Sequence, residues 1–254
     1  MSVSGPVTIA ELRELFEQKE TGIVAKIAEA DGMYQGNEAH YFHVGQSALQ
    51  SIKLAMLAAG KSSVGRLLDL PCGYGRVLRV LKAAFPQAEL TACDILTDGV
   101  DFCAAEFGAR PVYAQAEPGA IALDGEFDLI WCGSLLTHLA QTNWLGFLRL
   151  FDEHLAAGGL GVVTTHGRWV VERMRRGEEN YGLEPDQLQR LLADYEQAGF
   201  GFGHYFHSPD YGISASSPAW VCARLADFPR LRLLTFHERG WDDHQDVVAF
   251  ARVA

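Results

Sequence analysis

The turn that contains Gly73 and Gly75 is the part of this sequence best suited to hold a ligand. It follows an apolar run over residues 66–69 that ends in a carboxylate, Asp69. Glycines let the backbone approach a ligand closely because they have no Cβ atom. Glycine turns of this kind also bind phosphates, so the turn alone does not identify the ligand. Asp69 repels a pyrophosphate but can pair with a cationic amino group, and it therefore favours a ligand that carries one.

A strand, the glycine turn and a helix must position Asp69. The helix is predicted by apolar residues that recur at helical spacing, namely Val77, Leu78, Val80, Leu81, Ala84 and Phe85. This strand–turn–helix unit cradles nucleotide-like ligands in doubly wound α/β domains. Further strands are predicted over residues 88–94, 111–114, 127–132 and 160–165, with helices over 98–107 and 143–156. The alternation predicts a mostly parallel, doubly wound sheet with helices on both faces and a ligand site beyond the carboxyl ends of its strands.

Other segments surround this alternating pattern. Residues 1–63 are predicted to form an N-terminal helical cap, and residues 64–254 the ligand-binding domain. Within that domain, residues 167–215 break the alternation, and we expect an insertion over the strand ends, where a substrate lid would lie. Strands over 231–236 and 246–251 are close in sequence, which predicts an antiparallel hairpin and a sheet of seven strands.

The composition excludes some classes of function. The chain has 254 residues, 48% of them hydrophobic, and a formal net charge of −11, which argues against a broad surface for nucleic acid or anionic membranes. The five cysteines form no CxxC pair, and no HxH or HxxxH pair stands beside a carboxylate, so we expect free thiols and no metal site. The N-terminus lacks a basic region followed by an apolar stretch, and no stretch is long enough to span a membrane. These features predict a cytoplasmic protein and leave its oligomeric state open.

The order of the motifs resembles that of the class I S-adenosylmethionine-dependent methyltransferases that act on small molecules. The first strand and loop of that family read D/E-x-G-x-G-x-G, and residues 69–75 here read D-L-P-C-G-Y-G, with proline in place of the first glycine. Asp94 ends the second strand, where the family has an acidic residue. Residues 132–139 after the fourth strand and the A-G-G sequence of residues 157–159 before the fifth also match the family pattern. The resemblance covers residues 40–253.

This resemblance implies S-adenosyl-L-methionine as the cofactor. It places Asp69 close to the methionine amino group and Asp94 on the ribose hydroxyls, since a carboxylate can accept two hydroxyl hydrogen bonds at once. Gln115 or Ala116 would lie near the adenine, and the sequence does not decide between them. The cofactor-binding residues that the resemblance implies are Asp69, Cys72, Gly73, Gly75, Asp94, Ile95, Gln115, Ala116, Cys132 and Gly133.

The resemblance also implies methyl transfer to a small-molecule or sugar-containing acceptor, and we expect the accepting atom to be oxygen. A general base assists transfer to a hydroxyl, and histidine is suited to this role near neutral pH. His138, after the fourth strand, and His166, at the end of the fifth, are the candidate catalytic residues. His204, His207 and Tyr211 in the insertion are candidates for lining an acceptor pocket.

Two other functions stay open at this level. A protein that binds S-adenosylmethionine without catalysing methyl transfer would carry the same cofactor motifs. An NAD(P)-dependent oxidoreductase on the same kind of sheet would need the pattern G-x-G-x-x-G, whereas Arg76, Val77 and Leu78 follow Gly75.

Overall fold

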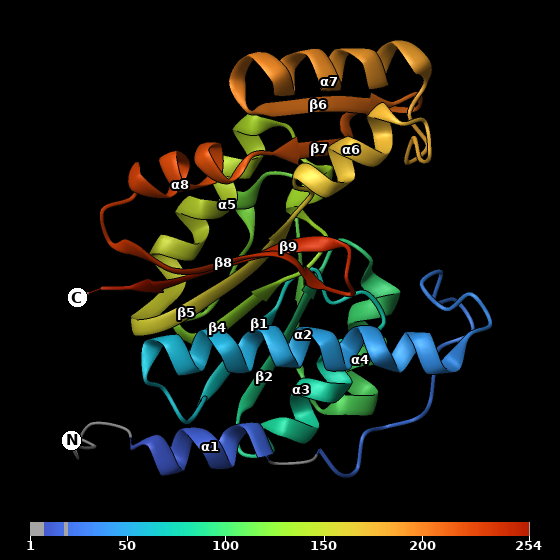
Figure 1. Cartoon of the computed structure of the whole chain (residues 1–254). Helices are drawn as coiled ribbons and strands as arrows, with labels where there is room; N and C mark the ends of the chain where they lie inside the picture. Colours follow the sequence, from blue (N-terminus) through green and yellow to red (C-terminus); the bar gives the residue numbers. More distant parts are fainter. Residues whose placement is uncertain (1–7, 18–19, 254) are drawn as a thin grey trace.

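A seven-stranded sheet with helices on both faces forms the centre of the protein (Figure 1). The computed structural model describes residues 8–17 and 20–253, so parts of the predicted cap, residues 1–7 and 18–19, lie outside the described residues. The strands of this sheet are β1 (Arg66–Asp69), β2 (Glu89–Asp94), β3 (Arg110–Tyr113), β4 (Phe127–Cys132), β5 (Leu155–Thr165), β8 (Leu231–Trp241) and β9 (Gln245–Arg252). Their order is β3-β2-β1-β4-β5-β9-β8, in which the first five are parallel and β9 runs antiparallel to both β5 and β8. The predicted fold class is confirmed, including the closing antiparallel hairpin.

Helices cover the two faces of the sheet through separate groups of apolar side chains. The helices are α1 (Ile9–Glu17), α2 (Glu38–Ala59), α3 (Leu78–Ala84), α4 (Thr97–Phe107), α5 (Gln141–His154), α6 (Arg168–Arg175), α7 (Pro185–Ala198) and α8 (Pro218–Ala226). The apolar side chains of α2, α3 and α4 pack on one face, and those of α5 and α8 on the other. The alternation of a strand supplies both cores, since Leu67 of β1 joins the first and Leu68 the second.

Helix α2 lies within the predicted helical cap and packs into the core of the sheet. The side chain of Asn37 caps it by accepting a hydrogen bond from the backbone N–H of His40, which starts the helix at Glu38. Gly60 ends it in the left-handed conformation, with φ of 64°. Because α2 shares a hydrophobic core with β1, β4 and β5, it is tied to the sheet by burial of apolar surface. The division of the chain at residue 63 stays a prediction.

The insertion contains a hairpin that the sequence pattern does not reveal. Strands β6 (Phe200–Tyr205) and β7 (Ser208–Ser216) pair antiparallel, and α7 lies against β6. A Cβ atom on Gly201 would stand 2.0 Å from the carbonyl oxygen of Leu191 in α7, so glycine is needed for this close contact. Glycine is uncommon in strands, and here it interrupts the alternation by which a strand is recognised.

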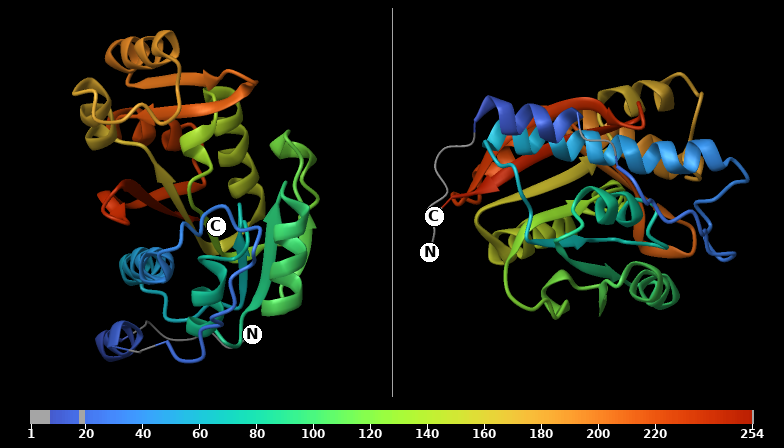
Figure 2. Two further views of the ribbon diagram at one scale, coloured as in Figure 1. Left: turned by 90° about the vertical axis from the view of Figure 1, so that its right-hand side faces the viewer. Right: turned by 90° about the horizontal axis from the view of Figure 1, so that it is seen from below.

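The insertion lies over the end of the sheet at which β4 and β5 finish. Ser216 donates a backbone hydrogen bond to the carbonyl of His166, and the hydroxyl of Ser214 donates one to the carbonyl of Leu136. In Figure 1 and in the left view of Figure 2, the insertion and α1 stand at opposite ends of the molecule. The insertion has its own cluster of apolar side chains, which includes Val170, Leu191 and Ile213.

The end of α5 and the start of β5 differ from the sequence prediction, and the sequence did not predict helix α8. Helix α5 ends at His154 rather than at residue 156, and β5 begins at once at Leu155. The A-G-G sequence of residues 157–159, expected before this strand, lies within it, and Gly158 has φ of 75°. Helix α8 begins at Pro218 after Ser217, whose side chain accepts from the N–H of Trp220. In the described part of the chain, no helix has the length and apolar character needed to cross a membrane.

Asp246, at the start of β9, makes the stability of the fold depend on pH. Burial raises the pKa of this carboxyl from 3.8 to about 6, although one oxygen accepts the N–H of Arg239. A carboxyl with a raised pKa contributes stability that is present below its unfolded pKa and is lost as the pH rises through its folded value.

We expect the free energy of unfolding of Asp246→Asn, measured relative to that of the wild type, to increase by about 3 kcal/mol as the pH rises from 4 to 8. Urea unfolding at both pH values measures this. The exposed control Asp186→Asn should show no such gain, and parallel pH curves for Asp246→Asn and wild type would contradict the prediction.

Candidate active site

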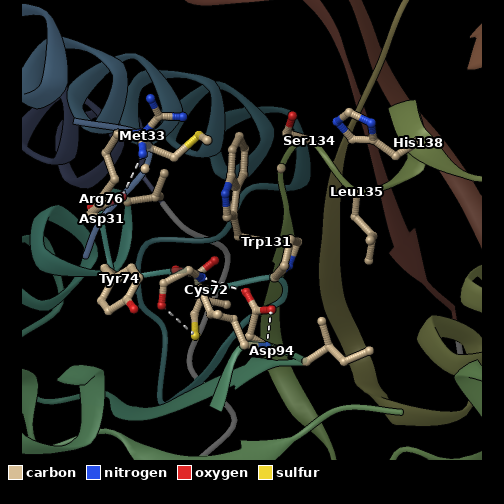
Figure 3. Close-up of a pocket in the computed structure, with 18 of the residues that line it drawn as sticks. Asp31, Met33, Cys72, Tyr74, Arg76, Asp94, Trp131, Ser134, Leu135 and His138 are labelled. Atoms are coloured by element: carbon tan, nitrogen blue, oxygen red, sulfur yellow. Dashed lines mark hydrogen bonds between the residues drawn. The ribbon is translucent and has the colours of Figure 1, made fainter. Parts of the chain in front are cut away.

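A pocket of about 460 Å³ lies at the carboxyl ends of β1, β2 and β4. Its wall is completed by the N-terminal segment 30–33, by Tyr211 of β7 and by Trp241 of β8. Figure 3 shows Asp94 and Cys72 at one end of the pocket and Ser134 and His138 at the other. The position agrees with the general rule that open α/β sheets bind ligands at the carboxyl ends of their strands.

Asp69 is a buried carboxylate at the inner wall of the pocket. It is 1% exposed, and neither of its oxygens has a hydrogen-bond partner among the described residues. Burial, and to a smaller extent the nearby charge of Asp94, hold the pKa of the Asp69 carboxyl well above its usual range. An unpaired buried carboxylate is costly, and a cationic amino group in the pocket would remove that cost.

The two glycines of the turn have different tasks. Gly73 lines the pocket and takes the left-handed conformation, with φ of 49°, while its N–H donates to Oδ2 of Asp94 over 2.7 Å. Gly75 does not line the pocket. A Cβ atom there would lie 2.2 Å from the ring of Phe107, so this glycine allows α4 to pack against the turn. Of the two, only Gly73 is placed where it can approach a ligand.

Asp94 holds the glycine turn and also faces the pocket. Its Oδ1 accepts the N–H of Leu96 at 2.9 Å, and its Oδ2 accepts the N–H of Gly73. A carboxylate oxygen has two lone pairs, so both oxygens can accept a further hydrogen bond from a ligand hydroxyl. Asp94 therefore combines the positioning of the turn with a binding surface for a diol.

His138 is a neutral imidazole with a defined tautomer. Its Nδ1 lies 2.7 Å from the carbonyl oxygen of Gly212, and because a carbonyl only accepts, Nδ1 carries the proton. The other nitrogen, Nε2, is then unprotonated and able to take up a proton. Burial holds the pKa of His138 below its usual value. The ring stacks on Tyr211, with centroids 4.9 Å apart and an interplanar angle of 14°, which fixes its orientation.

His166 lies beside His138 but not on the pocket wall. The centroids of the two rings are 6.5 Å apart. Burial, with the nearby His244 and His138, lowers the pKa of His166 to about 3, so the ring is neutral. The ring of His166 contacts that of His138 and is not among the side chains that line the pocket.

The structure brings together part of the predicted set of site residues. Those that line the pocket are Asp69, Cys72, Gly73, Asp94, Ile95, Gly133, His138 and, from the insertion, Tyr211. Those that do not are Gly75, Gln115, Ala116, Cys132, His166, His204 and His207. Gln115 and Ala116 are exposed after β3, and Cys132 is fully buried within β4.

Several pocket residues have no role in the sequence prediction. Arg76 is the one cationic side chain among the described lining residues, and burial lowers its pKa. It directly follows the glycine turn, so its place in the motif could have indicated it. Asp31 accepts the hydroxyl hydrogen of Tyr41 at 2.5 Å and reaches the pocket from a segment far from every motif. The indole rings of Trp131 and Trp241 meet edge to face, with centroids 5.3 Å apart, and form an apolar wall.

The chemistry of the pocket fits a cofactor with an amino group, a diol and a carboxylate. Asp69 supplies the unpaired negative charge, Asp94 the acceptors for a diol, and Arg76 a cation for a carboxylate. No group of three or more His, Cys, Asp or Glu side chains able to hold a metal ion occurs within residues 8–17 and 20–253.

Comparison with known proteins finds a methyltransferase domain within the chain. Residues 68–160 match the family model described as a methyltransferase domain. No curated protein sequence matches the chain. An S-adenosylmethionine-dependent methyltransferase from Clostridium acetobutylicum is similar in structure, with a TM-score of 0.57 and 13% identity over 84% of this chain and 92% of its own.

Two further solved structures share the fold. The N-methyltransferase NodS from Bradyrhizobium japonicum, in complex with S-adenosyl-L-homocysteine, has a TM-score of 0.52 and 15% identity over 98% of this chain and 99% of its own. The mitomycin 7-O-methyltransferase MmcR has a TM-score of 0.54 and 12% identity over 85% of this chain and 55% of its own. The domain match identifies a methyltransferase domain within residues 68–160, and the sheet order together with these structural similarities shows that the chain has the fold of the class I S-adenosylmethionine-dependent methyltransferases.

Proposed function

We propose that this enzyme transfers the methyl group of S-adenosylmethionine to a hydroxyl oxygen of a small-molecule or sugar-containing acceptor. The observation that carries the cofactor assignment is the buried, unpartnered carboxylate of Asp69, which fits the methionine amino group. Asp94 would bind the ribose hydroxyls, and Arg76 the methionine carboxylate. When bound, S-adenosylmethionine supplies an electrophilic methyl group on a positively charged sulfur.

The preference for oxygen rests on His138. Its Nε2 is unprotonated and its pKa is lowered, so near neutral pH it is ready to take the proton of an acceptor hydroxyl. The pocket wall orients the acceptor, and alignment of the reacting atoms supplies a large part of the rate enhancement in displacement reactions. His166 would act through His138, by fixing the position of its ring.

The acceptor class and the location rest on composition and on the insertion. The net charge of −11 disfavours nucleic acid, and the insertion encloses one side of the pocket through Tyr211. We propose a cytoplasmic location, which is supported by five free cysteines, four of them buried.

Replacement of Asp94 tests the cofactor assignment. We expect Asp94→Ala to weaken S-adenosylmethionine binding by about 100-fold, because it removes the charged acceptor of the ribose hydroxyls and the anchor of Gly73. Asp94→Asn keeps one oxygen acceptor and should lose less. Isothermal titration measures both affinities, and equal melting temperatures in the absence of ligand would exclude misfolding. Unchanged affinity in Asp94→Ala would rule out the ribose contact.

A second assay separates the enzyme from a protein that only binds the cofactor. Release of labelled methyl groups is measured with a panel of hydroxyl compounds. Cofactor binding without transfer to any member, under conditions that saturate the cofactor, would favour the non-catalytic alternative.

A further inference from the structure

Ser134 has a strained backbone at the edge of the pocket. It directly follows Gly133 after β4, lines the pocket and has φ of 57°, a conformation that a residue with a Cβ atom rarely adopts. Strain of this kind persists only where the surrounding structure holds it, and it occurs often at functional sites. The contacts that hold Ser134 therefore bear on what its side chain does.

A directed chain of three hydrogen bonds holds Ser134. Its backbone N–H donates to Oγ1 of Thr164 at 2.8 Å, and the hydroxyl of Thr164 donates to Oε1 of Gln245 at 2.6 Å. Nε2 of Gln245 then donates to Oγ of Ser134 at 3.1 Å. If the side-chain amide of Gln245 were flipped, its NH2 group would face the hydroxyl of Thr164. That hydroxyl already accepts the N–H of Ser134, so its own hydrogen would be buried without an acceptor. The chain therefore has one direction, and it ends with Ser134 as an acceptor.

Ser134 lines both this pocket and a smaller one of about 60 Å³, and the direction of the chain leaves its hydroxyl hydrogen uncommitted. No acceptor for it occurs among the residues that the structure describes, whereas its oxygen is already engaged by Gln245. His138, four residues after Ser134, offers an acceptor instead of a donor. Its Nδ1 donates its proton to the carbonyl of Gly212, so its Nε2 can only accept. Figure 3 shows both side chains at the end of the pocket away from Asp94. The pocket thus presents one hydrogen-bond donor and one acceptor at the same end.

We propose that Ser134 and His138 form an acceptor subsite that selects a hydroxyl group over an amine. This subsite rests on the methyltransferase function proposed above. A hydroxyl oxygen has two lone pairs and one proton, so it accepts from Ser134 with one lone pair, attacks with the other and donates its proton to Nε2 of His138. An amine nitrogen has a single lone pair, and a hydrogen bond from Ser134 would occupy the electrons needed for attack.

The balance of the reaction assigns each electron pair and proton. The acceptor oxygen forms the bond to the methyl carbon, and the electrons of the breaking carbon–sulfur bond remain on sulfur, which becomes neutral. The hydroxyl proton passes to Nε2 of His138. Ser134 keeps its own proton and is therefore a positioning and specificity-determining residue.

The test compares phenol with aniline, which have the same shape and are both uncharged near neutral pH. Phenol keeps one lone pair in the plane of its ring for Ser134, whereas the single lone pair of aniline is conjugated with the ring. Isothermal titration first establishes that S-adenosylhomocysteine binds, and then measures both probes against the loaded protein. We expect phenol to bind about tenfold more tightly, the effect of one hydrogen bond.

Two variants separate the hydroxyl of Ser134 from its backbone strain. Ser134→Gly relieves the positive φ and Ser134→Ala keeps it, but both remove the hydroxyl. We expect the ratio of phenol to aniline affinity to fall to about one in both variants, with S-adenosylhomocysteine binding retained. The exposed serine in Ser63→Ala serves as the control, with an unchanged ratio.

Four results would overturn the subsite. These are equal affinity for the two probes in the wild type, no binding of either probe, a ratio that survives in both Ser134 variants, and a ratio lost in only one of them. If S-adenosylhomocysteine itself does not bind, the proposed function fails and the subsite with it. Binding of S-adenosylhomocysteine without discrimination between phenol and aniline overturns the subsite alone.

Discussion

Asp69→Asn is expected to weaken S-adenosylmethionine binding by about 100-fold or more while it stabilises the ligand-free protein. The bound ammonium group would lose its buried, charged partner, and breaking such a pair by removal of one member costs about 3–5 kcal/mol. The ligand-free protein gains because the wild-type carboxylate is buried with neither oxygen paired. A single substitution should therefore move affinity and melting temperature in opposite directions.

The same residue predicts a proton release on binding. Because burial raises the pKa of Asp69, its contribution to stability is present at low pH and is lost as the pH rises through that raised value. A cationic ligand favours the carboxylate, so binding should release a proton in the wild type and none from this site in Asp69→Asn.

Titrations in two buffers with different heats of ionisation measure this proton release. The control is Asp186→Asn, an exposed carboxyl on α7 whose removal should change neither affinity nor proton release. Equal affinities of wild type and Asp69→Asn would show that no cationic group lies against this carboxylate.

His138→Gln is expected to reduce the rate of methyl transfer to a hydroxyl acceptor by about 10²–10⁴-fold, the range attributed to a general base. The rate of the wild type should be constant above pH 7 and fall as the pH drops through the lowered pKa of His138, because protonation of Nε2 removes the base. The variant should lose this acidic limb along with most of its activity.

A matched control for His138 exists elsewhere in the chain. Nδ1 of His154 also hydrogen-bonds to a carbonyl, that of Gly125 at 3.0 Å, but this half-buried side chain does not line the pocket. His154→Gln should therefore keep both the rate and the pH profile. An acidic limb that persists in His138→Gln would assign the titration to another group.

The sequence suffices for the elements whose residues interact with near neighbours in the chain. The glycine turn, Asp69 and Asp94 are found by local spacing, since a parallel sheet brings the carboxyl ends of successive strands to one edge. The alternation of strands and helices likewise predicts the order and direction of the sheet, because crossover connections allow few other arrangements.

The contacts that the sequence does not reveal are those that join distant segments. Asp31 reaches the pocket through Tyr41, Trp241 arrives from the second-last strand, and Gly212 fixes the tautomer of His138 from the insertion. Gly75 shows that a residue within a recognised motif can have a packing role that the motif does not reveal. Its place in the motif predicts a ligand contact, whereas its positive φ and the approach of Phe107 serve packing against α4.

The hydrogen bond between His138 and Gly212 links the chemistry of the base to the cover over the pocket. Gly212 belongs to β7, in a segment that folds around its own apolar cluster. Without the Gly212 carbonyl, Nδ1 would have no fixed acceptor, and the imidazole proton could occupy either nitrogen. The tautomer of this candidate base therefore depends on a backbone carbonyl that lies far from His138 in the sequence. Any exchange of this insertion for another would therefore have to supply a new carbonyl for His138 together with a new acceptor wall.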